Sequence, residues 1–574
     1  MNSLRDRIAA SGLGWRFVTV TVLFFVLANV MLWRAVYLKI TEREFLEKQG
    51  GMRYERVQEI SAHRGQVLDR NGEPLAVSTP METVWVNPRE LMPAIARLPE
   101  LASALGMDVV RLRDHVQRNA DKQFMYVKRQ ITPDEGARVK ALRIPGVNTR
   151  REYRRFYPTG EVMAHIIGFT NVDDEALEGI ERTYDHWLRG QPGARRVIKD
   201  LHGGVVEARE LIREARPGND LVLSLDRRLQ YLAYRELKAA VLANKAKGGT
   251  AVMIDVRTGE ILAMVNQPSF NPNDRSSIRP DLTRNRAVID AFEPGSTMKP
   301  FSVAVGLNSG KFRPDTPIDT HPGTMRVDRF TIRDHHNYGL LDVTGVIRKS
   351  SNIGVTKIAM AVGPEALWSF YDSLGLGRVS GTGFPGESSG RLRHFRDWSG
   401  SDIATHAYGY GMSVTALQLV RAYGAIAHDG VLMPVSFLKL DQAQEGKRVM
   451  DANVAATLRS MMEEVVKSGG TGTKAQVAGY RVAGKTGTAH KSQSGGYAED
   501  KYVAVFAGMA PASSPRLALA VMIDEPSTGV YYGGQVAGPV FSSIMEDALR
   551  MLNVPPDGIS PGTVVSVPGK GGHG

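Results

Sequence analysis

The 574-residue sequence contains no cysteine, so it has no disulfide, no thiolate metal ligand, no cysteine nucleophile and no lipid-modified N-terminal cysteine. This absence does not fix the compartment. The chain also lacks a block of like charge, because its 72 Lys and Arg residues are interleaved with 60 Asp and Glu residues. No basic and aromatic recognition motif accompanies the net charge of +12. Nucleic-acid binding is therefore disfavoured, and an anionic envelope or membrane surface is the more suitable partner.

Residues 17–33 form an uncharged, mostly apolar run with an arginine just outside each end. As a helix this run spans about 26 Å, slightly less than a hydrocarbon core of about 30 Å unless both arginines reach outward. Basic residues dominate the segment before it, so the positive-inside rule predicts a cytoplasmic segment at 1–16, a transmembrane anchor at 17–38 and export of the rest. A cleaved signal peptide and a buried core helix are the alternatives, and no convincing cleavage site follows the run.

A candidate nucleophile lies in the middle of the chain, in the segment Phe292–Pro300. Pro294 and Gly295 break the preceding structure, and the apolar run that follows favours a helix with Ser296 in or just before its first turn. Lys299 is three residues on, which on a helix places its amine on the same face and suits it as the base for Ser296. The same Ser-x-x-Lys pattern also occurs at Ser436 to Lys439. There the surrounding residues are typical of a β-strand, in which the two side chains would point to opposite faces.

Two further elements follow in the sequence, Ser350-Ser351-Asn352 and then Lys485-Thr486-Gly487-Thr488. Alone, the first is typical of a polar helix cap and the second of a turn. Ser-x-x-Lys, Ser-x-Asn and Lys-Thr-Gly in this order are the signature of penicillin-binding proteins and class A β-lactamases. Their order along one chain is far more specific than any one of them.

The first third of the exported part is charged and segmented, with predicted helices at Leu101–Asn119 and Asp134–Leu142. It shows no metal-ligand spacing and no catalytic cluster. We therefore expect residues 39–220 to form a folded pedestal or interaction domain, ending at the turn residues Pro217–Asp220.

Residues 221–552 read as one α+β domain. A strand, a helix at 227–242 and a hairpin at 250–265 open it, and strands at 503–508 and 517–523 precede a final helix from about residue 540. Strands at both ends predict a single sheet that distant segments complete. The Pro- and Gly-rich tail at 553–574 is predicted to be disordered.

The chain resembles the class B penicillin-binding proteins and, within them, the division-type (FtsI-like) septal peptidoglycan transpeptidases of Gram-negative bacteria. The resemblance covers nearly the whole length, and besides the anchor and the three elements above it rests on Arg64-Gly65, Asp69–Gly72, Tyr157-Pro158, Asn271–Asn273, Tyr408–Gly411 and Tyr531–Gly534. It implies a β-lactamase-like transpeptidase domain with a central antiparallel sheet flanked by helices. An elongated pedestal of the dimerisation type and one transmembrane helix would precede it.

The resemblance implies that Ser296 attacks the carbonyl between the two terminal D-alanines of a peptidoglycan stem peptide. A diamino-acid amine on a neighbouring stem then resolves the acyl-enzyme, and β-lactams acylate the same serine. It assigns proton relay to Ser350, the substrate amide to Asn352, and the ligand carboxylate to Lys485. Substrate binding falls to Thr486, Gly487 and Thr488, with the Ser296 and Thr488 amides as oxyanion hole. It implies no metal or other cofactor, and a polytopic SEDS glycosyltransferase and other division proteins as partners.

The base role sets a physical requirement on Lys299. A lysine accepts a proton only when neutral, which from a pKa of about 10.4 requires a downward shift of roughly three units. Burial and a nearby positive charge such as Lys485 both act in this direction. We therefore predict a dry, crowded pocket around Lys299.

Three alternatives share the same elements: a β-lactamase, a penicillin-sensing receptor and a non-catalytic division scaffold. A class A β-lactamase carries Glu-x-x-x-Asn between the second and third elements. Here the only asparagine between Asn352 and Lys485 is Asn453, and the residue four before it is Val449. This favours a long-lived acyl-enzyme, and the complete set of site residues argues against a decayed scaffold.

Overall fold

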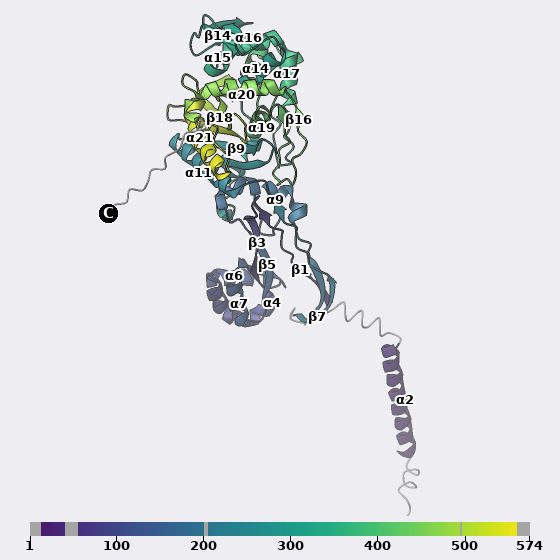
Figure 1. Cartoon of the computed structure of the whole chain (residues 1–574). Coiled ribbons are helices and arrows are strands. Elements are labelled where there is room, and N and C mark those ends of the chain that lie inside the picture. Colours follow the sequence, from purple (N-terminus) through teal and green to yellow (C-terminus); the bar gives the residue numbers. More distant parts are fainter. Residues whose placement is uncertain (1–12, 41–54, 200–204, 494–495, 559–574) are drawn as a thin grey trace, which may run out of the picture. The chain divides into compact units, whose positions relative to one another are not determined.

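The computed structural model describes residues 13–40, 55–199, 205–493 and 496–558 (Figure 1). Its contacts form two compact units that alternate along the sequence. We call residues 1–63, 80–153 and 190–217 the N-terminal unit, and residues 64–79, 154–189 and 218–574 the C-terminal unit. The chain therefore passes between the two units several times, whereas the sequence had suggested one boundary near residue 220. Most of the tail at 553–574 lies outside the described residues.

The apolar run near the N-terminus lies within helix α2, Leu13–Ile40. This helix is about 42 Å long and is entirely unburied over its most apolar window, whose mean hydropathy is 1.9. In the described part of the chain it is the one helix long and apolar enough to cross a membrane.

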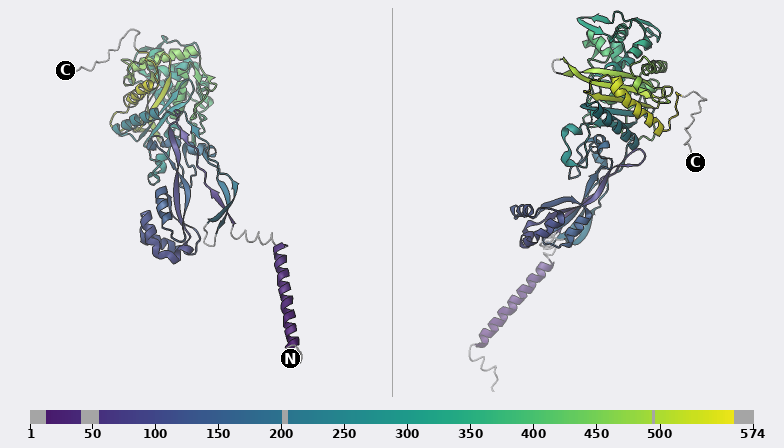
Figure 2. Two further views of the ribbon diagram at one scale, coloured as in Figure 1. Left: turned by 60° about the horizontal axis from the view of Figure 1, so that its bottom comes forward. Right: turned by 90° about the vertical axis from the view of Figure 1, so that its left-hand side faces the viewer.

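The predicted helix at 101–119 is wrong, because the N-terminal unit has two helices there, α5 (Leu98–Leu105) and α6 (Val109–Arg118). Gly106 ends α5 in the left-handed region at φ 61°, and the Asp108 carboxylate caps α6 by accepting from the Arg111 amide. These helices and α7 (Pro133–Ala141) bury a core against β3 (Pro74–Val86) and β4 (Met125–Ile131), and Figure 2 shows the helices gathered beside the strands.

The C-terminal unit is built on a five-stranded antiparallel sheet in the order β10-β9-β19-β18-β17. Its strands are β9 (Gly248–Asp255), β10 (Ile261–Gln267), β17 (Ala483–Gln493), β18 (Gly496–Ala510) and β19 (Leu517–Asp524). Every residue of β9, β10 and β19 is buried, so helices must cover both faces. The predicted α+β domain, completed by distant strands, is confirmed.

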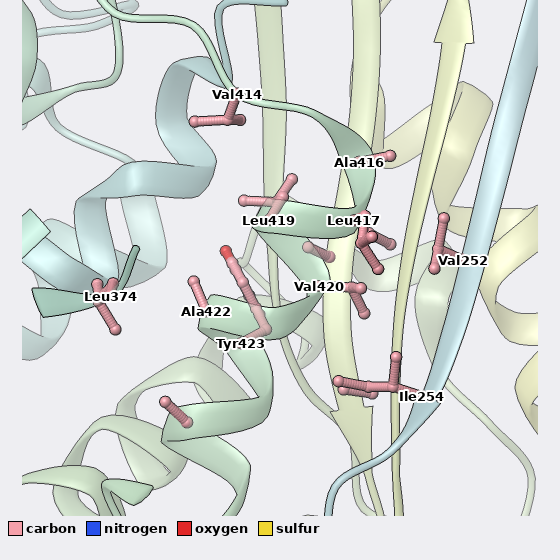
Figure 3. Packing of buried hydrophobic residues seen from close by; sticks show 14 of the residues in the cluster. Val252, Ile254, Leu374, Val414, Ala416, Leu417, Leu419, Val420, Ala422 and Tyr423 are labelled. Carbon is pink, nitrogen blue, oxygen red and sulfur yellow. The ribbon is translucent and has the colours of Figure 1, made fainter. Parts of the chain in front are cut away.

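Two hydrophobic clusters lie on opposite faces of this sheet. Helices α11 (Arg227–Ala243) and α21 (Gly533–Met551) cover one face. On the other face α19 (Ala416–Ala427) packs against β9, with Leu417 and Val420 beside Val252 and Ile254 (Figure 3). Helices α14 (Lys299–Asn308) and α20 (Ala452–Val466) also belong to this second face, which carries the candidate site.

Helix α21 begins at Gly533, seven residues before the predicted start, and contains Pro539. A Cβ on Gly533 would stand 2.2 Å from the Gly487 carbonyl oxygen, and one on Gly534 would stand 2.2 Å from that of Thr471. The two glycines therefore let the N-terminus of α21 contact β17. Apolar periodicity alone places the start too late, because glycine and proline weaken that signal.

Arg64, one of the residues on which the family resemblance rests, lies in a buried ionic cluster. Arg64 is 1% exposed and pairs with Glu181 at 2.8 Å and Asp185 at 2.6 Å, while Arg155 meets the other oxygen of Glu181 at 2.6 Å. A buried arginine needs such partners, since an unpaired charge there is costly. Nearby, the Asp69 carboxylate accepts from the Arg227 amide at the start of α11.

The remaining elements are short. The helices are α4 (Pro88–Leu91), α8 (Ala164–Ile167), α9 (Gly179–Thr183), α10 (Asp185–Leu188), α12 (Pro280–Thr283), α13 (Arg286–Ile289), α15 (Val343–Lys349), α16 (Asn352–Val362), α17 (Pro364–Ser373) and α18 (Gly400–Ala407), with 3₁₀ turns η1 (Met92–Arg97), η2 (Gly160–Val162), η3 (Arg275–Ser277), η4 (Gly295–Met298), η5 (Phe395–Asp397) and η6 (Thr473–Ala475). The strands are β1 (Glu55–Ile60), β2 (Val67–Leu68), β5 (Val147–Phe156), β6 (Gly193–Lys199), β7 (Val205–Arg213), β8 (Leu221–Val222), β11 (Pro317–Asp319), β12 (Thr324–Val327), β13 (Phe330–Arg333), β14 (Leu340–Asp342), β15 (Val431–Leu432) and β16 (Lys447–Arg448).

Candidate active site

Ser296 lies in the 3₁₀ turn η4, which leads directly into α14 at Lys299. Gly295 takes φ 55°, and its amide donates to the Gly409 carbonyl at 3.0 Å. The Thr297 hydroxyl donates to the Pro294 carbonyl at 2.7 Å and closes the turn. Ser296 itself is half-buried. The rest of the turn is thus held in place, while the serine side chain still reaches the surface.

Lys299 has no exposed surface, which confirms the predicted dry pocket. Its amine donates to the Ser350 carbonyl, to Ser350 Oγ at 3.1 Å and to Asn352 Oδ1 at 2.7 Å. Burial lowers the pKa of Lys299 from 10.5 to about 7, against the opposing attraction of the Asp334 carboxylate. A substantial fraction of this lysine is therefore neutral near pH 7.

Lys485 is the second buried lysine, and its amine donates to the same Ser350 hydroxyl at 2.9 Å. Burial, and then repulsion from Lys299, lower the pKa of Lys485 well below its ordinary value. The repulsion that was predicted to lower the pKa of Lys299 therefore lowers the pKa of Lys485 instead. With Ser350 Oγ between them, two full positive charges in this enclosure are unfavourable.

Ser350 and Ser351 form the junction between α15 and α16. Ser350 ends α15 in the left-handed region at φ 60°, which is uncommon for a residue other than glycine. Ser351 caps α16 by accepting from the Gly354 amide at 2.8 Å. The cap interpretation is confirmed, and the same junction places Ser350 Oγ between the two lysines. The functional role of this element stays a prediction.

Asp334 is a site residue that sequence reasoning missed. It follows β13, and its carboxylate accepts from the Ser351 hydroxyl at 2.5 Å and from the amides of Asn352 and Ile353. The Asn352 side-chain amide donates to the Arg333 carbonyl at 2.9 Å, which leaves its Oδ1 for Lys299. Asp334 precedes the helix that it caps by 18 residues, so no local capping pattern could have revealed it.

The β17 residues face two ways, as strand alternation predicts. Lys485 reaches the α14 face, whereas the Thr486 hydroxyl contacts that of Thr471 at 2.8 Å and Thr488 Oγ1 accepts from the Gly533 amide at 3.0 Å. These partners lie on the α21 side, but the Lys485 amine also donates to Thr486 Oγ1 at 3.4 Å, so the Thr486 hydroxyl borders the enclosure of the two lysines. Their role in ligand binding remains a prediction.

Gly487 has a clear steric reason to be glycine. A Cβ there would stand 2.8 Å from both the Pro294 carbonyl oxygen and Thr297 Cγ2. The close neighbour is thus the turn that carries Ser296. This contact brings the edge strand β17 against η4, so the Lys-Thr-Gly element and Ser296 lie side by side.

Tyrosines line the region beyond this contact. Tyr410 pairs edge-on with Tyr408 at 5.7 Å and with Tyr497 at 5.5 Å between ring centroids. Tyr531 stacks on Tyr502 at 3.9 Å. Four of the six aromatic residues here were noticed in the sequence, Tyr408, Tyr410, Tyr531 and Tyr532. Tyr497 and Tyr502 lie outside any motif and could not be singled out.

The sheet, its helical faces and the clustered serine, lysine and asparagine residues define a transpeptidase of the penicillin-binding class. Comparison with known families agrees: the penicillin-binding protein transpeptidase domain matches residues 249–546, and the penicillin-binding protein dimerisation domain matches residues 59–223.

The match to individual proteins is closer still. The peptidoglycan D,D-transpeptidase FtsI of Escherichia coli is 43% identical over 563 residues, which cover 97% of this chain and 95% of that protein. The chain belongs to this family, the FtsI-like peptidoglycan D,D-transpeptidases of cell division within the class B penicillin-binding proteins.

Two solved structures support the assignment. The transpeptidase domain of penicillin-binding protein 3 from Burkholderia pseudomallei is 49% identical, covers 58% of this chain and 97% of its own, and has a TM-score of 0.54. A peptidoglycan synthetase from Bifidobacterium adolescentis is 26% identical, covers 89% of this chain and 98% of its own, and has a TM-score of 0.70.

Proposed function

We propose that this transpeptidase works through an acyl-enzyme on Ser296, with Lys299 as the base. The observation that carries the proposal is the complete burial of Lys299, whose pKa of about 7 makes the neutral amine available at neutral pH. Lys299 lies three residues after Ser296, at the start of the same helical segment. A serine becomes a useful nucleophile only with such a neighbouring base.

The hydrogen bonds of Lys299 suit the neutral form. The Ser350 carbonyl and Asn352 Oδ1 can only accept, so they take the two hydrogens of a neutral amine. The third contact, to Ser350 Oγ, is the longest of the three, and the neutral amine gives it up, which leaves the nitrogen lone pair free. Lys299 in this state can take the Ser296 hydroxyl proton.

The first half-reaction then runs as follows. Ser296 Oγ bonds to the carbonyl carbon between the two terminal D-alanines, and its proton passes to Lys299. The C–N bond to the last D-alanine breaks, and the leaving amine takes a proton through Ser350, which contacts both lysines. In the second half-reaction a diamino-acid amine bonds to the same carbon, the ester C–O bond breaks, and the proton returns to Ser296.

Substrate binding falls to Asn352, Lys485 and the edge strand β17. Asn352 holds the substrate amide, and Lys485, with Thr486, Gly487 and Thr488, receives the terminal carboxylate, whose negative charge favours the protonated form of this lysine. The amides of Ser296 and Thr488 form the oxyanion hole. The contact of Gly487 with Pro294 and Thr297 supports this last assignment, since it brings the two segments together. β-Lactams enter the same site and acylate Ser296.

The apolar helix α2 and the family support a proposal for where the protein acts in the cell. We place the protein in the bacterial inner membrane, with α2 as a single transmembrane segment, residues 1–16 in the cytoplasm and the catalytic domain in the periplasm. Residues 39–220 serve as the pedestal, and residues 221–552 as the transpeptidase domain. A SEDS glycosyltransferase and other division proteins are the expected partners at the septum.

A coupled assay tests this function. The full chain in detergent is mixed with a peptide ending in D-Ala-D-Ala and a stem peptide carrying a free side-chain amine, and D-alanine release and the new amide are measured by mass spectrometry. We expect both products from the wild type, and a loss of at least a hundredfold for Ser350→Ala. D-alanine release without amide formation would indicate a carboxypeptidase and contradict the proposal.

A further inference from the structure

A cavity of about 400 Å³ lies next to the nucleophile turn, on the face of the sheet that carries Lys485. Its wall includes Phe292 and Glu293, which directly precede the Pro294–Ser296 turn, and Ala489–Ser492, which directly follow Thr488. The two segments that build the candidate site therefore continue into this cavity. The reaction steps derived for acylation use none of its side chains.

The charged groups of the cavity are paired with one another, with one exception. Arg284 pairs with Asp290. Asp524 receives Arg286 at 3.2 Å and Lys491 at 2.6 Å. Among the described residues of the wall, the carboxylates of Asp290 and Asp524 thus have cationic partners, and that of Glu293 has none.

Glu293 has only neutral hydrogen-bond donors. Its Oε1 accepts from the Gly411 amide at 2.9 Å and from the Tyr497 hydroxyl at 3.1 Å. Its Oε2 is enclosed and has no hydrogen-bond partner in the described part of the chain. Burial raises the pKa of Glu293. A carboxylate held in this way is undersatisfied, and a cation that reached it would be bound strongly.

The aromatic residues around Glu293 suit the same kind of ligand. Tyr410 and Tyr497 form an edge-on pair beside the carboxyl group, and the faces of tyrosine rings attract ammonium groups. The Tyr497 side chain is 48% exposed and lies near the turn between β17 and β18.

We propose that Glu293 binds the ammonium group of the acceptor stem peptide and positions its amine beside the acyl group on Ser296. The inference rests on the proposed acyl-enzyme and concerns its second step alone. The first step needs recognition of the donor's D-alanines, whereas the second needs a separate place for the acceptor. Its bound ammonium group loses one proton to water, the neutral amine then bonds to the acyl carbon as the ester C–O bond breaks, and its second proton returns to Ser296. Glu293 meets this need because it is three residues from Ser296 and lacks a cationic partner.

The test measures how the acyl-enzyme divides between competing nucleophiles. The full chain in detergent is acylated with an N-acyl-D-alanyl thioester and offered either an N-acetylated stem tripeptide with a free diamino-acid amine or hydroxylamine, which is neutral at pH 8. Glu293→Gln should lower transfer to the stem peptide at least tenfold, mainly through a higher acceptor KM. Transfer to hydroxylamine should stay within about twofold of the wild type, and Glu293→Asp should recover part of the loss.

Glu499→Gln is the matched control, because it removes one exposed negative charge from β18 without lining the cavity. It should leave both transfers unchanged. An equal loss toward both nucleophiles in Glu293→Gln, or no loss, would overturn the inference and leave the acyl-enzyme intact. A wild type that forms no acyl-enzyme on Ser296 would overturn the proposed function itself, so the two failures are distinguishable.

Discussion

The residue with the most demanding environment is Lys299. Burial lowers its pKa from 10.5 to about 7 despite the opposing Asp334 carboxylate, and the two contacts that can only accept hydrogen bonds match the two hydrogens of a neutral amine. A lysine left in water would be protonated at neutral pH and could not take a proton from serine. The enclosure is therefore a chemical requirement of the proposed base.

The pH dependence of acylation checks this residue directly. Lys299 acts only when neutral, so the second-order rate constant for acylation by benzylpenicillin should be level above pH 8 and fall about tenfold per pH unit below pH 7. Stopped-flow measurement between pH 5 and 11 gives the profile. An inflection near pH 10 would show a lysine with its ordinary pKa, and the assignment of the base would be wrong.

At this scale, the sequence revealed residues whose spacing is local or belongs to a known pattern. Ser296, Lys299, Ser350, Asn352 and Lys485 were found in this way. Asp334, Thr471 and Tyr497 were not, because each acts on a residue far from it in sequence and carries no motif. Polar residues of this kind are common on any surface, so only their position in space marks them.

At the scale of elements, α16 is the helix on which the site depends. Asp334 caps its first turn and also fixes Ser351, so one carboxylate sets the start of the helix and the direction of Asn352. The same charge opposes the shift in the pKa of Lys299. The cap and the electrostatics of the base are therefore linked.

Asp334→Asn tests this link. Loss of a charged helix cap should destabilise the protein by about 1–2 kcal/mol, measured by thermal unfolding, and should slow acylation about tenfold as Asn352 loses its fixed orientation. Because the Asp334 carboxylate favours the charged form of Lys299, its removal should move the inflection of the pH profile below that of the wild type.

Asp328→Asn is a suitable control for this change. Asp328 lies just before β13, and its carboxylate accepts from the Ser401 amide, away from the lysines. It should leave the inflection in place. An unchanged inflection in Asp334→Asn would mean that the carboxylate does not act on Lys299.

Elements were predictable where apolar periodicity is strong and failed where backbone chemistry interrupts it. The buried strands β9 and β19 were found from their apolar runs. The helix predicted at 101–119 missed the break that Gly106 and Asp108 impose, and the start of α21 was hidden by two glycines and a proline. In both cases two or three residues outweighed the pattern around them.

At the scale of the whole molecule, the C-terminal unit includes two segments from the first third of the chain. Val67, Leu75 and Ile166 share a hydrophobic cluster with Leu223 and Ile261. A sequence read in order suggests one boundary, because composition changes once near residue 220. Contacts between residues that are more than a hundred positions apart in the sequence cannot be inferred from composition.

A chain that begins at residue 221 therefore loses part of its own core. We expect it to unfold at a temperature at least 5 °C lower than a chain that begins at residue 55, since the lost apolar burial and the cap from Asp69 on α11 exceed about 4 kcal/mol. It should still be acylated by benzylpenicillin, because all the proposed site residues are present. Equal unfolding temperatures would show that these segments add no stability.

The most direct test of the central claim is intact-mass spectrometry of the full chain with benzylpenicillin, for the wild type and for Ser296→Ala. Matching thermal unfolding curves establish that the variant is folded. We predict a persistent adduct of one drug molecule on the wild type and none on the variant. An adduct that remains on Ser296→Ala, or hydrolysed drug with no adduct on the wild type, would contradict a long-lived acyl-enzyme on Ser296.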